Sequence, residues 1–440
     1  MGKPQLPLRA RLLQTLLSKQ DALACLFNQG IVSVAGFATS VLIGRWASKA
    51  ELGLYIIGLS SVLFVRGFQQ QLVSTPYTIY HHRRSDSLLP AYRGSCVIQQ
   101  LGFVGITLVF LIAQIVAAGA GWVSAEAIPP EVIPALVALL IFIPAILMRE
   151  IVRTYCFVHA KNTSVLAIDL AISILQIGLL FVFGFCGILS GATGWVAIGA
   201  SCVLAIGYWY FRFGPSIQFD RKRLAEDLKL NWTFGKWAVS GVFVGSLPTF
   251  LLPWLLLAAA GADGTGLLGA AMTLVGVANI FNTGMLNYLT PKAALVYVEE
   301  GKPGLRQLMV QMYLLFLVAI GIFVALMATF GDWIAVNVFN DDFTGLQTVL
   351  TLLAVSKLFE GFSHTASGGL FAMERIKENF WIDVVLMVIT ITAALLLIQP
   401  HGVLGVAWTT LIGSVTGAIL RSILLAIFLR QESSSGALNG

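Results

Sequence analysis

The sequence has few charged residues. Asp, Glu, Lys and Arg make up only 11% of its 440 residues, whereas 58% are hydrophobic. Its mean hydropathy of +0.86 lies far above that of a soluble globular domain. With about 20 residues needed for each membrane-spanning helix, the hydrophobic runs fill most of the chain. The sequence therefore predicts an all-α polytopic membrane protein.

The sequence also lacks the motifs of several functional classes. Its five cysteines have neither metal-ligand nor CxxC spacing, so we interpret them as small core residues and predict no metal or other cofactor. No nucleotide-binding G-x-x-x-x-G-K-[ST] loop is present, which excludes ATP hydrolysis as a visible energy source. No predicted outer loop exceeds roughly 15 residues, which leaves little room for an extracytoplasmic catalytic domain. These absences favour a gradient-driven transporter over an enzyme.

The hydrophobic runs predict twelve membrane spans. Their approximate residue ranges are 22–44, 53–77, 95–119, 133–157, 164–187, 190–211, 237–260, 264–291, 307–330, 347–371, 379–398 and 402–428.

Three short motifs recur at a nearly constant distance along the chain. The segment 157–169 runs from Phe to Ile-Asp and is echoed 214 residues later by 371–383. Gly53-Leu-Tyr has a counterpart 213 residues later at Gly266-Leu-Leu, and Gly187-Ile-Leu has one 215 residues later at Gly402-Val-Leu. The spacing indicates an internal duplication, which is a common plan among secondary transporters.

The duplication predicts two pseudo-symmetric lobes of six helices each. We place the N-lobe at 1–211, with an amphipathic lead-in, and the C-lobe at 237–430. Between them, 212–236 carries hydrophobic residues at helical spacing among charges, which predicts an amphipathic connector on the cytoplasmic membrane surface. The tail 431–440 is polar and is predicted to be disordered.

The loops differ in charge on the two sides of the membrane. Lys and Arg resist translocation, so the basic loops and both termini are predicted to be cytoplasmic. The basic loops contain Arg83, Arg84, Arg93, Lys161, Arg221, Lys222, Arg223, Lys229, Lys292, Lys302, Arg306, Arg375 and Lys377. The opposite loops are acidic apart from Arg45 and Lys49. The net charge of +6 therefore reflects the basic loops on the cytoplasmic side of the membrane. Because the chain has no soluble basic face, we expect no nucleic-acid partner.

Ionisable residues within hydrophobic spans are costly in lipid and usually face a cavity. Arg66 lies about 13 residues, or roughly 20 Å, into the second predicted span, with Gln70 one helical turn further on. We predict that both residues bind substrate, the alternative for Arg66 being a side chain that extends to the cytoplasmic interface. Arg149 and Arg153 are spaced i, i+4 in the fourth span and are either further substrate-binding residues or interfacial ones. Arg421 lies nearer its span's cytoplasmic end, and we predict that it is interfacial.

The second half of the chain carries two further polar groups. Asn282 and Asn287 belong to a polar stripe in the eighth span, which either binds sugar hydroxyls or joins helices. Lys357, Glu360 and His364 share one face of the tenth span. We predict that these three residues couple transport to proton movement, the alternative being a structural ion pair between helices.

The segment 44–55, with its Arg-containing turn followed by Leu52-Gly53-Leu54-Tyr55, resembles the first-loop signature of polysaccharide-exporting flippases. The hairpins at 157–169 and 371–383 resemble that family's fourth-to-fifth and tenth-to-eleventh turns. Gly266-Leu267-Leu268 resembles the start of its eighth span, with Leu268 where Tyr is usual, and Pro291 resembles the Pro that closes it. The family belongs to the multidrug, oligosaccharidyl-lipid and polysaccharide exporter superfamily.

This resemblance implies a V-shaped cavity between two lobes and alternating access. The implied substrate is a sugar unit on an undecaprenyl diphosphate carrier, moved from the cytoplasmic to the outer leaflet for O-antigen or exopolysaccharide export. Implied partners are the membrane lipids and the polysaccharide polymerase and chain-length machinery. Buried arginines suit the diphosphate.

Three alternatives stay open. A multidrug cation exporter shares the superfamily fold but needs acidic sites, whereas the deep charges here lean positive. Lipid II flippases usually have fourteen spans, and this sequence predicts twelve. A membrane glycosyl polymerase or ligase normally needs a sizeable outer catalytic loop.

Overall fold

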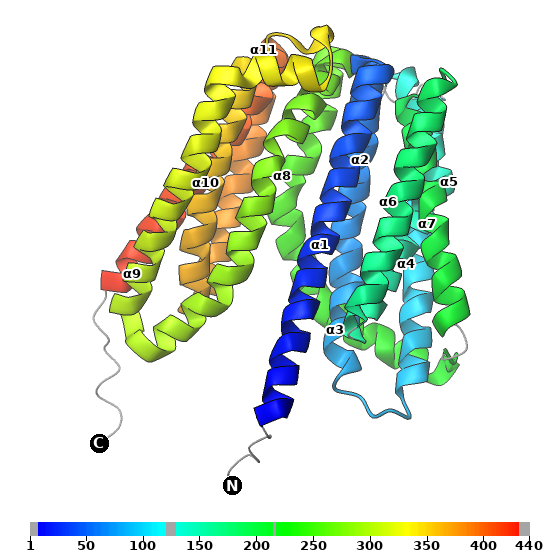
Figure 1. The fold of residues 1–440 in the computed structure, drawn as a ribbon, viewed down its shortest axis with the longest axis vertical. Helices are drawn as coiled ribbons and strands as arrows, with labels where there is room; N and C mark the ends of the chain where they lie inside the picture. The colour runs from blue at the N-terminus through cyan, green and yellow to red at the C-terminus, as the bar shows by residue number, and fades with distance from the viewer. Residues whose placement is uncertain (1–7, 120–128, 160, 214–216, 431–440) are drawn as a thin grey trace. The chain divides into compact units, whose positions relative to one another are not determined.

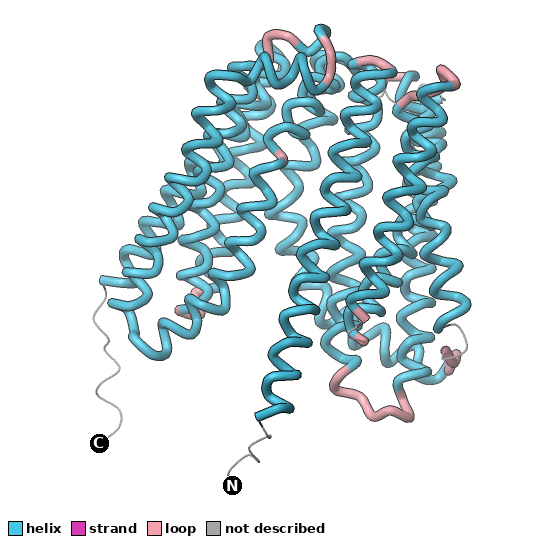
Figure 2. Tube along the Cα trace, viewed as in Figure 1, coloured by secondary structure: helices cyan, strands magenta, loops and turns pink. Residues whose placement is uncertain are grey.

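A computed structural model describes residues 8–119, 129–159, 161–213 and 217–430, and all regular structure within these ranges is helical (Figures 1 and 2). The tail predicted to be disordered lies outside the described residues. The α-helices are α1 (Leu8–Trp46), α2 (Lys49–Gln69), α3 (Thr75–His81), α4 (Leu89–Gly119), α5 (Ile133–Val158), α6 (Asn162–Phe185), α7 (Gly191–Phe213), α8 (Arg221–Val275), α9 (Val277–Val338), α10 (Gln347–Ala372) and α11 (Ile376–Arg430). Two 3₁₀ turns, Pro130–Val132 and Asp341–Phe343, precede α5 and α10.

Among the described residues, nine helical stretches are long and apolar enough to cross a membrane. Three of the longest helices each contain one glycine whose positive φ interrupts the helix: Gly261 in α8, Gly301 in α9 and Gly402 in α11. Glycine adopts this conformation without steric cost, so it lets the chain reverse direction there. Gly276, between α8 and α9, keeps helical dihedral angles, so the end of α8 and the start of α9 count as one segment. With that segment counted once, dividing the helices at the three glycines and adding α10 gives the twelve segments that the sequence predicts.

The described residues form two compact units. Unit 1 contains 8–47, 61–119 and 130–239, and unit 2 contains 48–60 and 240–430. The start of α2 is therefore grouped with unit 2 and its remainder with unit 1. The first part of α8, which includes the predicted connector, belongs to unit 1.

The backbone repeats across the two units at the spacing found in the sequence. The turn between α5 and α6 has a hydrogen bond from Lys161 N to Cys156 O, and the turn between α10 and α11 has one from Arg375 N to Leu370 O, each 2.9 Å long. Each atom of the second bond lies 214 residues after its counterpart in the first. Gly187 and Gly402, which the sequence pairs, both have positive φ. The repeated motifs therefore form equivalent turns.

Gly53 and Gly266, the third repeated pair, lie at a close helix crossing within unit 2. A Cβ atom on Gly53 would clash with the carbonyl oxygen of Ala262, and one on Gly266 would clash with that of Lys49. Ala262 lies four residues before Gly266, and Lys49 lies four residues before Gly53. The two helices therefore contact each other through the same pair of positions on both sides of the crossing. Only glycine lets the two backbones approach this closely.

A π-helical segment, Gln70–Ser74, joins α2 to α3. Its cause is Pro76, which has no N–H to donate to the carbonyl of Leu72 four residues earlier. Thr75 N instead reaches back to Gln70 O, which widens the helix. The freed carbonyl of Leu72 accepts a 2.9 Å hydrogen bond from Gln99 Nε2 on α4, so its hydrogen-bonding capacity is satisfied by a neighbouring helix.

The first turns of α8 pack against α4 through buried polar side chains. Asp227 accepts hydrogen bonds from Arg84 (2.5 Å) and Ser95 (2.7 Å). Asn231 accepts one from the hydroxyl of Tyr92 at 3.0 Å. The aromatic residue Trp232 stays 56% exposed. The docked face of this segment is therefore polar, and Trp232 lies on its exposed side.

The cysteine prediction holds for three of the four described side chains. Cys96, Cys156 and Cys202 are buried, whereas Cys186 is exposed where α6 ends. A thiol is small and weakly polar, so its presence in a hydrophobic segment does not require core burial.

Candidate functional site

The principal charged cluster of unit 1 is built on one stretch of α5. Arg149 and Arg153 lie one turn apart, so both side chains face α6. There Asp169, whose side chain is fully buried, receives Arg149 Nη2 at 2.6 Å on one oxygen and Arg153 Nε at 3.0 Å on the other. Two guanidinium groups thus share one carboxylate inside a hydrophobic helix pair, which offsets the cost of burying each charge.

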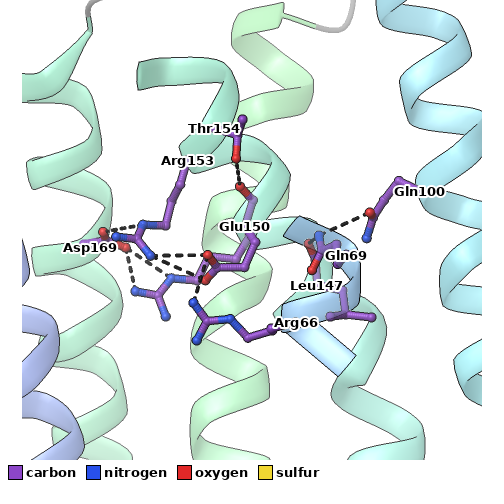
Figure 3. A network of polar contacts seen from close by, with 9 residues as sticks. Arg66, Gln69, Gln100, Leu147, Glu150, Arg153, Thr154 and Asp169 are labelled. Atoms are coloured by element: carbon purple, nitrogen blue, oxygen red, sulfur yellow. Dashed lines mark hydrogen bonds and ion pairs between the residues drawn. The ribbon is translucent and has the colours of Figure 1, made fainter. Parts of the chain in front are cut away.

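A second carboxylate extends this cluster to α2 (Figure 3). Glu150 Oε2 lies 3.0 Å from Arg66 Nη2 and 3.4 Å from Arg153 Nη1. Arg66 is the most exposed of the five residues at 35%, while Arg149 and Arg153 are 12% and 14% exposed. Three guanidinium groups face two carboxylates, so the cluster carries one net positive charge and presents it through Arg66.

The amide residues beside Arg66 have different environments. Gln69 is buried, and its Nε2 donates to Gln100 Oε1 at 3.1 Å and to the carbonyl of Leu147 at 2.7 Å. Gln70, which the sequence selects, is exposed and begins the π segment. π segments occur frequently at functional sites because they reorient side chains that a regular helix would align. Gln69 therefore connects the site to α4 and α5, and Gln70 lies on the surface.

The structure brings Arg66, Arg149 and Arg153 together, and it supplies the partner that sequence reasoning missed. The sequence places Asp169 at the end of a repeated motif but does not indicate its partners. Its position seven residues into α6 was a usable signal, because a carboxylate inside a hydrophobic helix requires a cationic partner. Arg149 and Arg153 are held against Asp169, and their roles as substrate-binding or interfacial residues stay predictions.

Unit 2 contains an equivalent carboxylate with a different cation. Asp383, the counterpart of Asp169, pairs with Arg421 from the last part of α11. The same guanidinium donates to Asn379 Oδ1 at 2.9 Å and to Ser363 Oγ at 2.5 Å. The side chain of Arg421 is only 11% exposed, so it is buried among protein groups, and its position near the cytoplasmic interface stays a prediction. Ser363 stands where the repeat places Arg149 in unit 1, so the cation that pairs with the repeated aspartate comes from another helix.

Lys357, Glu360 and His364 lie together on α10. Lys357 Nζ is 2.6 Å from Glu360 Oε2, and His364 Nε2 is 3.5 Å from Glu360 Oε1. Their side chains are 21%, 35% and 37% exposed, respectively. The carboxylate therefore contacts a fixed cation on one oxygen and a titratable imidazole on the other, and all three groups are partly accessible.

The predicted polar stripe of the eighth span divides between two environments. Asn282 is 3% exposed, and its Nδ2 lies 3.4 Å from the carbonyl of Lys357 on α10. Asn287 is exposed, as are Asn279, Thr283 and Thr290. Asn282 thus joins two helices, and the other four residues form an accessible polar stripe.

No protein-family model matches this sequence, and no curated protein matches it. Solved structures do match its fold. An inward-facing multidrug resistance MATE family transporter of the MOP superfamily aligns with a TM-score of 0.74 and 15% identity, covering 90% of this chain and 94% of that one. The lipid II flippase MurJ, in an inward closed conformation, aligns with a TM-score of 0.68 and 14% identity over 92% of this chain and 87% of MurJ.

A third match is a MOP superfamily transporter from Pyrococcus furiosus, with a TM-score of 0.64 and 14% identity over 92% of this chain and 94% of that one. It is described as having a binding pocket of reverse polarity that suggests a different function. The chain therefore has the two-lobed, all-helical fold of the superfamily's multidrug transporters and lipid flippases, and it is a multi-pass membrane protein.

Proposed function

We propose that this protein is a flippase for a lipid-linked oligosaccharide. Its substrate is a sugar unit on an undecaprenyl diphosphate carrier, which it moves from the cytoplasmic to the outer leaflet of a bacterial inner membrane by alternating access. The product feeds a polysaccharide polymerase and its chain-length machinery. The observation that carries this proposal is the net positive charge of the unit 1 cluster, presented through Arg66.

The cluster geometry suits a diphosphate. Within the described part of the chain, the one ion pair of Arg66 is with Glu150, and Glu150 keeps a second partner in Arg153. An incoming phosphate can therefore replace Glu150 at Arg66 without leaving that carboxylate unpaired. Arginine binds phosphate through parallel hydrogen bonds, and such charge-assisted bonds are stronger than neutral ones. Arg149 and Arg153 add to the positive potential of the cluster, and Gln70, near Arg66 on the chain, offers an amide suited to a sugar hydroxyl. In unit 2, Asn287 on the exposed stripe stays a predicted sugar-binding residue.

The rival function is export of organic cations, as in the multidrug transporters of this fold. Among the described residues, the hydrophobic helices contain the carboxylates of Glu150, Asp169, Glu360 and Asp383, and each already contacts Arg or Lys. A cationic drug would have to displace one of these partners and leave it unpaired. The Pyrococcus transporter, by its description, indicates that pocket polarity can differ within this fold. The positive polarity of the present cluster favours an anionic substrate.

The test is transport by the purified protein in reconstituted vesicles. One assay follows translocation of a fluorescent oligosaccharide on polyprenyl diphosphate, and a parallel assay follows uptake of a fluorescent organic cation. Arg66→Ala removes a charged hydrogen bond worth about 1.5–3 kcal/mol, so we expect lipid-linked transport to fall by about 10- to 100-fold. Arg66→Lys keeps the charge without the planar donor pair and should retain partial activity.

Arg223→Ala is the matched control. It also removes one positive charge from unit 1, but from an exposed pair with Asp220, and it should transport normally. Wild-type rates in Arg66→Ala would remove Arg66 from the binding site. Cation uptake without lipid-linked transport by the wild type would establish the rival function instead.

A further inference from the structure

Unit 1 contains an open apolar groove between α1 and α6. It has a volume of about 640 Å³, within the size range of small-molecule binding sites. All of its lining residues but Ser173 are apolar, and they include Phe27, Gly30 and Val34 on α1 with Leu170, Ile174 and Ile177 on α6. Phe27, Val34 and Ile174 are each more than 60% exposed, so the walls of the groove are accessible along its length.

The groove is a consequence of how two helices pack. Gln176 Nε2 on α6 donates a buried 2.7 Å hydrogen bond to Thr39 Oγ1 on α1, which holds the helices together beside the groove. At Gly30 there is no side chain to fill the space, and a Cβ atom there would meet nothing within 4 Å. The hollow is therefore open space between anchored helices.

The groove and the charged cluster share helix α6. Asp169, which pairs with Arg149 and Arg153, immediately precedes Leu170 on α6, and Ser173 follows it by one turn. The carboxylate that anchors the net positive cluster and the apolar lining of the groove thus lie within one turn of each other on the same helix. This juxtaposition complements an amphiphile with an anionic head and a hydrocarbon tail.

We propose that the α1–α6 groove binds the polyprenyl tail of the lipid-linked substrate. The inference rests on the proposed function and adds to it a second binding site, which recognises the lipid carrier rather than the sugar. The first segment of the tail occupies the groove while the diphosphate contacts Arg66. Because the groove is open, the remainder of a long chain can extend into the bilayer.

The glycines of α1 allow a matched test. Gly30→Trp places a large side chain in the groove, into space that the structure leaves empty. Gly36→Trp places the same side chain on the same helix, where a Cβ atom likewise meets nothing within 4 Å but outside the groove lining. Both variants are compared with the wild type in vesicles, using one oligosaccharide diphosphate on a long polyprenyl carrier or on a short-chain analogue.

We expect Gly30→Trp to lower transport of the long-chain substrate by about tenfold, which corresponds to about 1.4 kcal/mol of lost tail binding. Competition by a soluble sugar diphosphate without a tail should be unchanged, because Arg66 is intact. Gly36→Trp should match the wild type on every substrate. Wild-type transport by Gly30→Trp would overturn the groove proposal and leave the flippase proposal standing. Failure of the wild type to move any lipid-linked sugar would overturn both.

Photolabelling the unmodified protein supplies a second measurement that does not depend on a variant folding. A polyprenyl diphosphate with a diazirine near its head should label peptides covering 27–35 and 170–177. A phospholipid with a diazirine in its acyl chain, at the same concentration, should label them weakly. Equal labelling by both probes would mean that the groove holds bulk bilayer lipid, contrary to the proposal.

Discussion

Asp169 holds the unit 1 cluster together. Its fully buried carboxylate contacts Arg149 through one oxygen and Arg153 through the other. Replacing it leaves one guanidinium without a carboxylate, because Glu150 contacts Arg153 but forms no ion pair with Arg149. An unpaired buried charge is the costly species here, more than the loss of any single attractive contact.

Asp169→Asn should therefore destabilise the protein by about 3–5 kcal/mol. The measurement is the unfolding transition of the detergent-solubilised protein, followed in denaturant. Asp220→Asn is the control, since Asp220 is 42% exposed in its pair with Arg223 and asparagine can still cap the start of α8. We expect that variant to stay within about 0.5 kcal/mol of the wild type. Equal stability of the two variants would contradict the structural role of Asp169.

Glu360 differs from Asp169 because it and its partners, Lys357 and His364, are partly accessible to solvent. We propose that protonation of Glu360 releases Lys357 to bind the substrate anion and that His364 exchanges the proton with the cytoplasmic side. Histidine suits this role because its unperturbed pKa lies near physiological pH. Glu360→Gln mimics the protonated carboxyl, so it should fold normally and transport at a rate independent of an imposed proton gradient.

The comparison for Glu360→Gln is Glu378→Gln, which breaks the exposed pair between Glu378 and Arg375 at the same i, i+3 spacing. Vesicles with and without a pH gradient provide the readout. Gradient-dependent transport that persists in Glu360→Gln would assign the α10 residues a structural role.

At the scale of elements, the π segment between α2 and α3 depends on a neighbouring helix. Pro76 leaves the carbonyl of Leu72 without its usual donor, and Gln99 replaces that donor from α4. Gln99 also accepts a 2.8 Å hydrogen bond from Asn231, so the same side chain connects the segment with the start of α8. The local distortion beside Arg66 and Gln70 is thus stabilised by tertiary contacts.

A double-mutant cycle tests this dependence. Gln99→Ala alone should cost about 1–3 kcal/mol, because the Leu72 carbonyl loses its donor. In a Pro76→Ala background the new N–H can take that place, so the cost should be smaller by about 1 kcal/mol. The contribution of Asn231 cancels within the cycle. Additive effects in denaturant unfolding would show that Gln99 does not compensate for Pro76.

For the whole molecule, loop charge predicts orientation, since Lys and Arg are retained on the cytoplasmic side. A reporter fused after Asp342, in the acidic loop before α10, should behave as extracytoplasmic. A reporter fused after Arg223, within the basic connector, should behave as cytoplasmic. A fusion after Gly345 should agree with the first site. The reverse pattern would invert the direction of transport that we propose.

The sequence alone was sufficient for the helical class, the twelve segments and the internal repeat. Hydrophobic run length determines how many helices the chain can place in a membrane. The repeat survives as equivalent turns because the same backbone bonds close both of them, as Lys161 and Arg375 show. These properties depend on residues close together in the chain, so patterns in the sequence predict them.

The tertiary structure decided which helix supplies the ion-pair partner of each buried charge. Helical spacing shows that Arg149 and Arg153 share a face, but it does not show that Asp169 lies opposite. The partners of Arg421 could not be predicted for the same reason, since Asp383 and Ser363 lie on other segments that meet it only after packing. A buried charge is stabilised by groups distant in sequence, and their identity follows from the arrangement of the helices.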